Sequence, residues 1–292
     1  MLLTIFTPTY NRANTISRTF ESLCRQSMRD FEWLIIDDGS TDNTSDLIAL
    51  FKQKANFPII YTQKENGGKH TAYNLALELA HGDLLFTVDS DDWLPCDSLE
   101  IIASKLSEIY KSDDIAGLIA LKKYPTGKII GNTFPAGLKP ASVYELEHSG
   151  NGGERSIILK TEVARKFPFP CITKENFMGE CIVYDAIGLK FKFTISNSIL
   201  TICEYQADGL SSNPYKLMIS NPGGYMYYYR NRIDMAESIP ERINYILRYN
   251  AFRYLYKPDS ISELYSGSHK ILNKILSPLS AIVAKIYKSK SV

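Results

Sequence analysis

Short apolar runs alternate with segments of helical periodicity along the first half of the chain. The apolar runs, each short enough to be one strand, lie at 2–7, 31–36, 58–62, 84–88 and 115–121. Between them, apolar residues recur at the spacing of one helical face over 14–26, 43–54, 69–80 and 97–110. Such strand–helix–strand units have right-handed crossovers and build a mostly parallel sheet with helices on both faces. We therefore expect an α/β fold whose ligands bind beyond the carboxyl ends of the strands.

Length and charge narrow the classes of protein that fit this pattern. The chain has 292 residues, enough for one large domain or for one domain with a smaller appendage. Its 33 Lys and Arg nearly balance its 32 Asp and Glu, so no net positive field draws the chain to nucleic acid. We therefore expect no nucleic-acid partner, and a charged ligand must be bound by a local cluster.

The number and spacing of the cysteines and the lengths of the apolar runs indicate the cellular compartment of the protein. The five cysteines are odd in number and contain no C-x-x-C pair, which argues against a disulfide framework and against a zinc site. The first ten residues resemble a strand rather than a signal peptide, and no apolar run reaches the ~18 residues of a membrane span. We expect a protein of a reducing compartment, the cytoplasm.

The fourth apolar run is followed by two carboxylates, Asp89 and Asp91, on either side of Ser90, and Asp92 adds a third. Carboxylate oxygens at a strand end suit Mg²⁺ or Mn²⁺, which bind through one or two carboxylates and complete their shell with water and substrate phosphates. A calcium loop is not indicated, because Leu94 stands where that loop needs a glycine. The alternative is a solvated acidic turn that caps the next helix, and the residues alone leave both interpretations open.

Polar loops also follow the second and third runs. Capping of the next helix explains the Ser, Thr and Asn residues after the second run but not the adjacent Asp37 and Asp38. Carboxylates at this edge accept hydrogen bonds from a ribose hydroxyl or a base N–H, which favours a binding role. After the third run, Gly67 and Gly68 precede Lys69, so that backbone N–H groups and one cation are placed to meet a phosphate. A flexible turn explains the same glycines, and no phosphate-loop or dinucleotide fingerprint is present.

One stretch of the second half, 174–190, carries the acids Glu175, Glu180 and Asp185. A base that deprotonates an alcohol must be a carboxylate or a histidine near the reacting hydroxyl, and the four scattered histidines form no cluster. The acids are therefore candidates for a base. The alternative is that they pair with neighbouring lysines on a solvated face.

Four motifs, taken in this order, resemble glycosyltransferase family 2. They are Thr7-Pro8-Thr9-Tyr10-Asn11-Arg12, Ile36-Asp37-Asp38-Gly39-Ser40-Thr41-Asp42, Asn66-Gly67-Gly68 with Ala72-Tyr73-Asn74, and Asp89-Ser90-Asp91-Asp92. The resemblance covers about the first 110 residues and continues more loosely to about residue 213 through 167–170, Glu180 and 204–211. It implies a GT-A fold, a nucleotide-sugar donor, a divalent metal (Mn²⁺ or Mg²⁺) and transfer of the sugar with inversion at the anomeric carbon.

The resemblance also implies roles for individual donor-binding residues. It places Pro8, Tyr10 and Asp38 around the base and Asp37 and Arg12 around the nucleoside. It places Lys69 near the diphosphate and Asp89 and Ser90 near the ribose and the metal. Asp91, together with Asp89, would bind the metal that neutralises the leaving diphosphate.

The catalytic base is the one role for which this chain departs from the family pattern. In the family the base lies in an acidic pair at the start of a helix facing the acceptor, and the matching place here reads Gly179-Glu180-Cys181. The second acid is missing, so the resemblance makes Glu180 the base by default, with Asp185 and Glu175 as fallbacks. Glu180 would take the proton of the acceptor hydroxyl as that oxygen attacks the anomeric carbon from the face opposite the leaving nucleotide.

The last part of the chain, 269–290, combines apolar residues at helical spacing with lysines. This pattern predicts an amphipathic helix that is bent or broken near Pro278. Such a helix either attaches the chain peripherally to the cytoplasmic face of a membrane, which suits a lipid-linked acceptor, or packs on the catalytic domain with its lysines in water.

The sequence thus predicts a GT-A catalytic domain over 1–213, with a nucleotide-sugar half over 1–110 and an acceptor half over 111–213, followed by a helical extension over 214–292. The expected activity is transfer of a sugar, from a UDP-sugar by family habit, to a saccharide or lipid-linked saccharide acceptor in bacterial cell-surface polysaccharide synthesis. Two alternatives stay open. A nucleotidyltransferase of similar fold would carry a Gly-rich signature near the N-terminus, which 7–12 lacks. A catalytically silent nucleotide-sugar or carbohydrate-binding protein fits the missing second acid.

Overall fold

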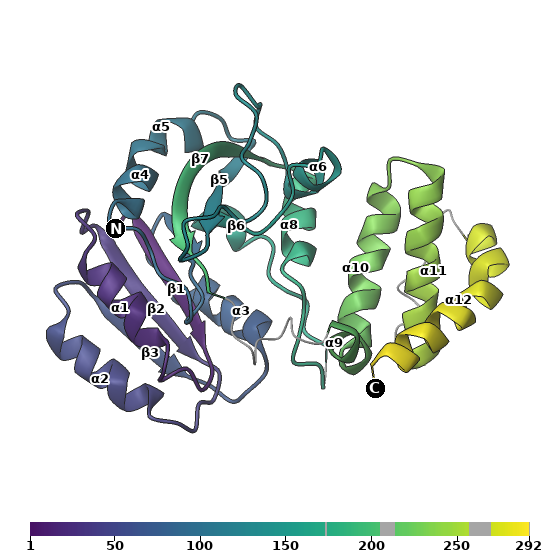
Figure 1. Ribbon diagram of the computed structural model, residues 1–292, viewed down its shortest axis with the longest axis horizontal. Coiled ribbons are helices and arrows are strands. Elements are labelled where there is room, and N and C mark those ends of the chain that lie inside the picture. Colours follow the sequence, from purple (N-terminus) through teal and green to yellow (C-terminus); the bar gives the residue numbers. More distant parts are fainter. Residues whose placement is uncertain (173, 205–213, 257–269, 292) are drawn as a thin grey trace. The chain divides into compact units, whose positions relative to one another are not determined.

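The computed structural model describes residues 1–172, 174–204, 214–256 and 270–291 (Figure 1). Contacts divide the chain into two compact units, Met1–Phe169 with Val183–Gln206 and Pro170–Ile182 with Ala207–Val292. The part of the family resemblance that falls on 205–211 lies outside the described residues. Each unit has a hydrophobic core of its own.

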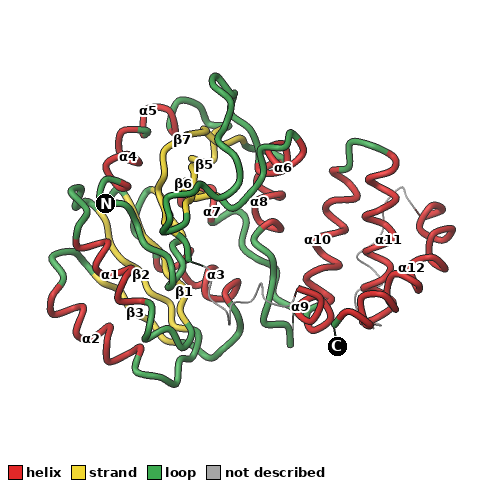
Figure 2. The backbone as a smooth tube through the Cα atoms, in the orientation of Figure 1, coloured by secondary structure: helices red, strands yellow, loops and turns green. Residues whose placement is uncertain are grey.

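The first unit is built on a seven-stranded sheet with the strand order β3-β2-β1-β4-β6-β5-β7 (Figure 2). The strands are β1 (Leu3–Thr9), β2 (Phe31–Asp37), β3 (Ile59–Gln63), β4 (Leu84–Thr87), β5 (Ile115–Lys123), β6 (Arg155–Lys160) and β7 (Lys192–Ile202). Strands β1 to β4 pair in parallel, β6 is antiparallel to both of its neighbours, and β5 and β7 are parallel. The predicted mostly parallel sheet is confirmed, and the five apolar runs of the sequence correspond to β1 through β5.

Helices cover both faces of this sheet. They are α1 (Ile16–Cys24), α2 (Thr44–Lys54), α3 (Lys69–Leu79), α4 (Ser98–Ser104), α5 (Leu106–Ile109), α6 (Val143–His148), α7 (Thr161–Ala164) and α8 (Cys181–Gly188). Helices α1, α2 and α4 pack on the face that includes Trp33, whereas α3 packs on the opposite face, where the rings of Tyr73 and Phe6 lie 6.0 Å apart. The helix predicted over 97–110 is divided into α4 and α5 by a turn at Lys105.

Strands β1 and β2 lie at the centre of the first core, where all of their residues are buried. Strands covered on both faces have continuous apolar runs rather than alternating ones, as these two do. Some of their polar side chains pair inside the core: the Thr4 hydroxyl donates to Glu32 Oε1 at 2.6 Å, and the Trp33 indole N–H donates to Thr7 Oγ1 at 2.9 Å. The register places Thr9 beside Asp37, so the loops after β1 and β2 leave the sheet at the same edge.

The second unit is mainly helical. Its helices after the sheet are α9 (Pro214–Ser220), α10 (Pro222–Met235), α11 (Ile239–Tyr256) and α12 (Lys270–Lys290). Aromatic residues of three of these helices, Tyr229, Phe252 and Tyr287, pack together in its core. The predicted helical C-terminal extension is confirmed, and Pro278 lies inside α12. Among the described helices, none is both long and apolar enough to cross a membrane.

Candidate functional site

The loops after β1 and β2 are joined at the carboxyl edge of the sheet. Asn11 has a positive φ of 51°, which asparagine tolerates better than most residues. Its backbone N–H donates to Ser40 Oγ at 2.9 Å, and its side-chain oxygen accepts from the Thr41 N–H at 2.8 Å. The sequence of both loops is therefore explained in part by the need to hold them together.

Three predicted donor-binding residues lie on or next to the first of these loops. Pro8 is buried in β1, Arg12 is half-buried, and Tyr10 exposes a large part of its ring. Burial and Asp89 raise the pKa of the Asp91 carboxyl, and the charge of Arg12 offsets part of that rise, which places Arg12 near the acidic loop after β4. The structure thus brings residues of two of the motifs to one edge.

Asp37 is fully buried beneath the loop that follows β2. Its Oδ1 accepts from the Ser40 N–H and its Oδ2 from the Tyr61 hydroxyl, both at 2.7 Å. Burial and the hydrogen bond to Asp37 raise the pKa of the Tyr61 phenol. Asp37 therefore shapes the edge of the site from below, and its predicted place near the nucleoside stays a prediction.

Asp38 joins the loop after β2 to the loop after β3. Its Oδ1 accepts from Lys64 Nζ at 2.6 Å and from the Gly67 N–H at 3.0 Å, and its Oδ2 accepts from the Gly68 N–H at 2.7 Å. Gly68 has a φ of +89°, which residues with a side chain rarely adopt. A carboxylate offers about four acceptor positions, so three donors leave Asp38 able to accept one more hydrogen bond. Lys64 is a partner that the sequence did not identify.

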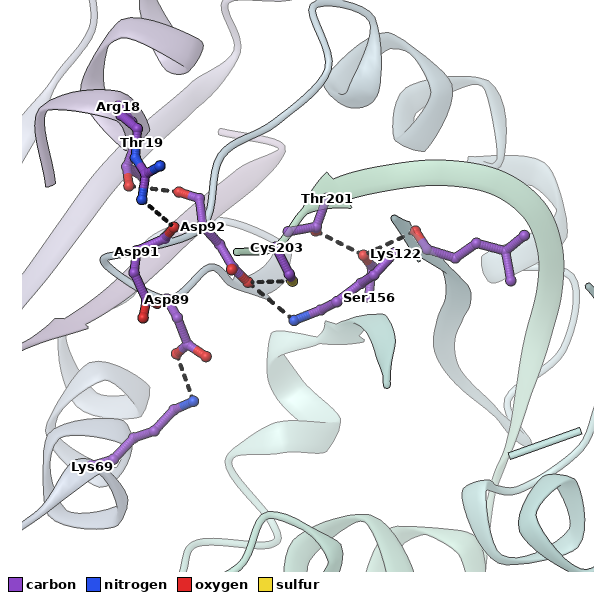
Figure 3. A network of polar contacts seen from close by, with 11 residues as sticks. Arg18, Thr19, Lys69, Asp89, Asp91, Asp92, Lys122, Ser156, Thr201 and Cys203 are labelled. Carbon is purple, nitrogen blue, oxygen red and sulfur yellow. Dashed lines mark hydrogen bonds and ion pairs between the residues drawn. The ribbon is translucent and has the colours of Figure 1, made fainter. Parts of the chain in front are cut away.

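Lys69 and Asp89 form an ion pair at the same edge (Figure 3). Lys69 begins α3, Asp89 follows β4, and 2.6 Å separates Lys69 Nζ from Asp89 Oδ1. Burial by itself would raise the pKa of Asp89, but the charges of Lys69 and Lys122 hold it below its ordinary value. The predicted phosphate-binding cation and one predicted metal ligand therefore lie together, with the carboxylate ionised.

Asp91 carries the second carboxylate of the acidic loop, and Ser90 between the two is buried. Burial and the charge of Asp89 raise the pKa of Asp91, although Arg12 and Lys69 lower it. The charge of Asp89 thus disfavours ionisation of Asp91, and a divalent cation bound to both carboxylates would relieve that repulsion.

The donor set of this loop fits one kind of metal site. In the part of the chain that the structure describes, no group of three or more His, Cys, Asp or Glu is arranged to hold a metal ion. A metal at this loop would therefore be held by the pair Asp89 and Asp91 rather than by a larger set of such side chains. Two carboxylates are enough for Mg²⁺ or Mn²⁺, because these ions complete their coordination with water and phosphate oxygens.

Asp92 points into the protein and belongs to a buried network (Figure 3). Its Oδ2 accepts from Lys122 Nζ at 3.2 Å and from Cys203 Sγ at 3.0 Å, while its backbone carbonyl accepts from the Thr19 hydroxyl at 2.7 Å. Burial raises the pKa of Asp92 to about 6, although the charge of Lys122 lowers it. Burial lowers the pKa of Lys122, but Asp92 raises it well above its ordinary value. The pair is therefore ionised at neutral pH.

Lys122 and Cys203 are residues that the sequence analysis missed. They lie 30 and 111 positions from Asp92, so no local pattern links them to the acidic motif. One signal was available, because a lysine directly after the apolar run 115–121 must either reach water or find an acid. Lys122 pairs with Asp92 instead of reaching water, and its side chain is only 12% exposed.

The end of β7 is fastened to the residues that follow the acidic loop. The backbone of Trp93 pairs with that of Ile202 at 3.1 and 2.8 Å. Arg18 of α1 lies 4.6 Å over the Trp93 ring and forms an ion pair with Glu204. Glu204, with which the later resemblance segment 204–211 begins, is thus connected to the neighbourhood of the acidic loop.

The three candidate bases have different surroundings. Glu180 directly precedes α8, is partly exposed and belongs to the second unit, while Asp185 lies inside α8 and is fully buried. Glu175 is buried at the N-terminus of α10, where its two oxygens accept from the N–H groups of Gly223 at 2.6 Å and Gly224 at 2.8 Å. Burial raises the pKa of Glu175, and those N–H groups lower it. Glu175 therefore serves as a helix cap.

Solved structures define the class of fold. TarS 1–349 from Staphylococcus aureus, in complex with UDP-GlcNAc, matches with a TM-score of 0.60 and 18% identity over 96% of this chain and 79% of that one. The mannosyltransferase PcManGT from Pyrobaculum calidifontis, in complex with GDP-Man and Mn²⁺, matches with a TM-score of 0.56 and 17% identity over 99% and 82%. Both are glycosyltransferases, and the predicted GT-A fold is confirmed.

Sequence comparison defines the family. Residues 4–135 match the profile of glycosyl transferase family 2. Chondroitin synthase from Pasteurella multocida is 36% identical over 136 residues, 46% of this chain and 14% of that protein. The poly(ribitol-phosphate) beta-N-acetylglucosaminyltransferase TarS is 31% identical over 110 residues, 37% of this chain and 19% of that protein. Residues 4–135, a little under half of the chain, thus match glycosyl transferase family 2, and the matched part spans less than a fifth of either relative.

Proposed function

We propose that this chain is a metal-dependent glycosyltransferase that moves a sugar from a nucleotide sugar, in the first place a UDP-sugar, to an acceptor hydroxyl. The observation that carries the proposal is the pair Asp89 and Asp91 after β4, next to Lys69 and to the loops after β1 and β2, in a region of family 2. The UDP-GlcNAc bound to TarS and the GDP-Man and Mn²⁺ bound to PcManGT support a nucleotide-sugar donor and a divalent metal.

The nucleoside is bound, in this proposal, by the loops after β1 and β2. The exposed ring of Tyr10 offers a flat surface on which a base can stack, beside the buried Pro8. Asp38 accepts a base N–H at the acceptor position that its three protein donors leave free. Asp37 supports this loop from beneath, and Arg12, whose charge acts on Asp91, lies beside the nucleoside in this proposal.

The diphosphate is bound at the acidic loop. Asp91 and Asp89 hold the divalent metal, whose charge stabilises the leaving diphosphate when the ion is bound. Lys69 adds a positive charge at the same point, since its ammonium already lies 2.6 Å from Asp89. Ser90, which is buried between the two acids, lies near the ribose and the metal in this proposal.

The transfer step needs a base for the acceptor. Glu180 takes the hydroxyl proton, the acceptor oxygen forms a bond to the anomeric carbon, and the bond from that carbon to the diphosphate breaks on the opposite face. Inversion of configuration follows from this geometry. In this proposal the acceptor is a saccharide of a cell-surface polymer, free or lipid-linked. The names of chondroitin synthase and of the poly(ribitol-phosphate) N-acetylglucosaminyltransferase TarS support polymer glycosylation in general.

Glu180→Gln tests the base. We expect it to lower kcat for transfer by roughly 10²–10⁴-fold, the usual contribution of a general base, while UDP binding stays unchanged. Transfer of labelled sugar and UDP-dependent thermal stabilisation measure the two quantities separately.

Two other acids serve as comparisons for Glu180. Glu175→Gln weakens the cap of α10. We therefore expect it to lower the melting temperature rather than to cause a specific loss of kcat. If Asp185→Asn abolishes transfer in a folded chain while Glu180→Gln transfers normally, the assignment of Glu180 is wrong.

The proposed function is tested by the thermal stability of the purified chain with UDP, GDP, CMP and dTDP, each with Mn²⁺ and with a chelator. A ligand that binds the folded state raises the melting temperature by mass action. We expect the largest rise with UDP and Mn²⁺ together. A chain whose melting temperature responds to none of the nucleotides under either condition has no donor site at this edge, and the proposal fails.

A further inference from the structure

Helix α12 of the second unit packs on its neighbours through one face. Leu276, Ser280, Ala284 and Tyr287 are buried, and their spacing of three or four residues is that of one helical face. Arg248 of α11 donates to the Tyr287 hydroxyl at 3.0 Å, and three of the four residues belong to the core of the unit. This face fixes the rotation of α12 about its own axis.

A second apolar stripe of α12 is exposed. Leu279, Ile282 and Ile286 are 53%, 56% and 45% exposed, and their spacing of three and four places them along one line. With about 3.6 residues per turn, this line lies roughly a third of a turn from the buried face. In the described part of the chain no other exposed large apolar residues stand three or four positions apart. A cluster of this kind, unlike scattered apolar residues, marks an interaction surface.

Lysines flank the stripe, and α12 itself has no acid to offset them. By helical spacing, the exposed Lys285 lies about a quarter of a turn from the stripe on one side, and the exposed Lys290 lies nearer to it on the other. The Lys290 ammonium also contacts the Tyr215 hydroxyl of α9 at 3.3 Å. The sequence contains no Asp or Glu after Glu263, so α12 itself carries positive charge alone. We call the stripe with Lys285 and Lys290 the outer face of α12.

We propose that the outer face of α12 docks on an anionic lipid surface, with the helix lying in the plane of the interface. The three apolar side chains enter the boundary of the acyl chains, and the lysine stems extend along it while their ammonium groups reach the anionic headgroups. Charge favours this partner over a second copy of the chain, because two outer faces brought together would oppose lysines with no acid between them. The proposal does not depend on the transferase function.

Sedimentation of the full chain with lipid vesicles tests the proposal. We expect binding to phosphatidylcholine vesicles that contain about 30% phosphatidylglycerol, and little binding to phosphatidylcholine alone. Two variants should each weaken this binding by about tenfold or more. One is the triple variant Leu279→Ser with Ile282→Ser and Ile286→Ser, and the other is Lys285→Gln with Lys290→Gln. The lysine variant should also lose most of the salt dependence of binding.

Matched control variants test whether vesicle binding is specific to the outer face or common to any exposed apolar residue or lysine. Ile239→Ser removes a 70% exposed apolar residue of α11, and Lys52→Gln with Lys54→Gln removes two exposed lysines of α2. Both should bind vesicles like the unaltered chain, and all variants should keep its melting temperature because the residues are exposed.

Either of two results overturns the proposal. In the first, the full chain does not sediment with anionic vesicles, or the triple serine variant binds as well as the unaltered chain. In the second, the serine variant changes only the sedimentation coefficient of the free protein, which would make the stripe a contact between copies.

Discussion

Asp91→Asn is expected to remove metal-dependent turnover while leaving the fold intact. An amide keeps the size of the side chain but not the negative charge that Mg²⁺ or Mn²⁺ requires, so UDP release from a UDP-sugar should fall roughly 10²-fold or more. Stability should stay equal or rise, because burial and Asp89 disfavour the Asp91 charge in the folded chain. A Mn²⁺ titration of UDP release and a thermal unfolding curve measure the two effects.

Asp97→Asn is the matched control for that variant. Asp97 lies six positions further along the chain, is exposed, and makes no side-chain hydrogen bond to the start of α4. Its loss should leave both turnover and metal dependence unchanged. Equal turnover in Asp91→Asn and in the unaltered chain, at every Mn²⁺ concentration, would contradict the proposed role of Asp91.

Lys122→Met is expected to cause the largest loss of stability. It leaves the buried carboxylate of Asp92 without its cation, and breaking a buried ion pair from one side costs about 3–5 kcal/mol. Lys122→Arg keeps the charge and should lose less. Denaturant unfolding gives the free energy of unfolding for each variant.

A double variant and a surface variant make this prediction specific to the pair. Lys122→Met combined with Asp92→Asn removes both charges and should recover part of the loss. Lys105→Met breaks the exposed pair with Glu108, whose atoms are 2.8 Å apart, and should cost about 1 kcal/mol or less. If Lys122→Met and Lys105→Met cost the same, the buried network does not stabilise the acidic loop.

The parallel half of the sheet was predictable because its information is local. Each of β1 to β5 is a short apolar run with a helical pattern before or after it, and β1 and β2 are buried along their whole length. Strands β6 and β7 were not predicted. The strand β6 begins with Arg155 and ends with Lys160, so only four residues lie between two charged ones. The strand β7 carries Ser and Asn among its apolar residues, so neither strand forms a clear apolar run. Their pairing with β4 and β5 depends on contacts between distant segments, which periodicity does not encode.

The candidate site was predictable as a set of loops but not as a set of contacts. Because ligands bind at the carboxyl ends of parallel strands, the sequence predicted that Asp38, Lys69 and Asp91 lie at one edge of the sheet. The sequence did not reveal that Asp38 is held by Lys64, or that Glu175 caps α10 far along the chain. Such contacts arise when buried carboxylates must find donors, and the donor chosen depends on the folded geometry.

The central claim is tested most directly by transfer of a labelled sugar from a UDP-sugar, UDP-GlcNAc first, to a saccharide acceptor in the presence of Mn²⁺. We expect a labelled product that requires Mn²⁺ and disappears with Asp91→Asn. A folded chain that yields no glycosylated product from any UDP-, GDP- or dTDP-sugar, with a panel of free and lipid-linked saccharide acceptors, would contradict the account.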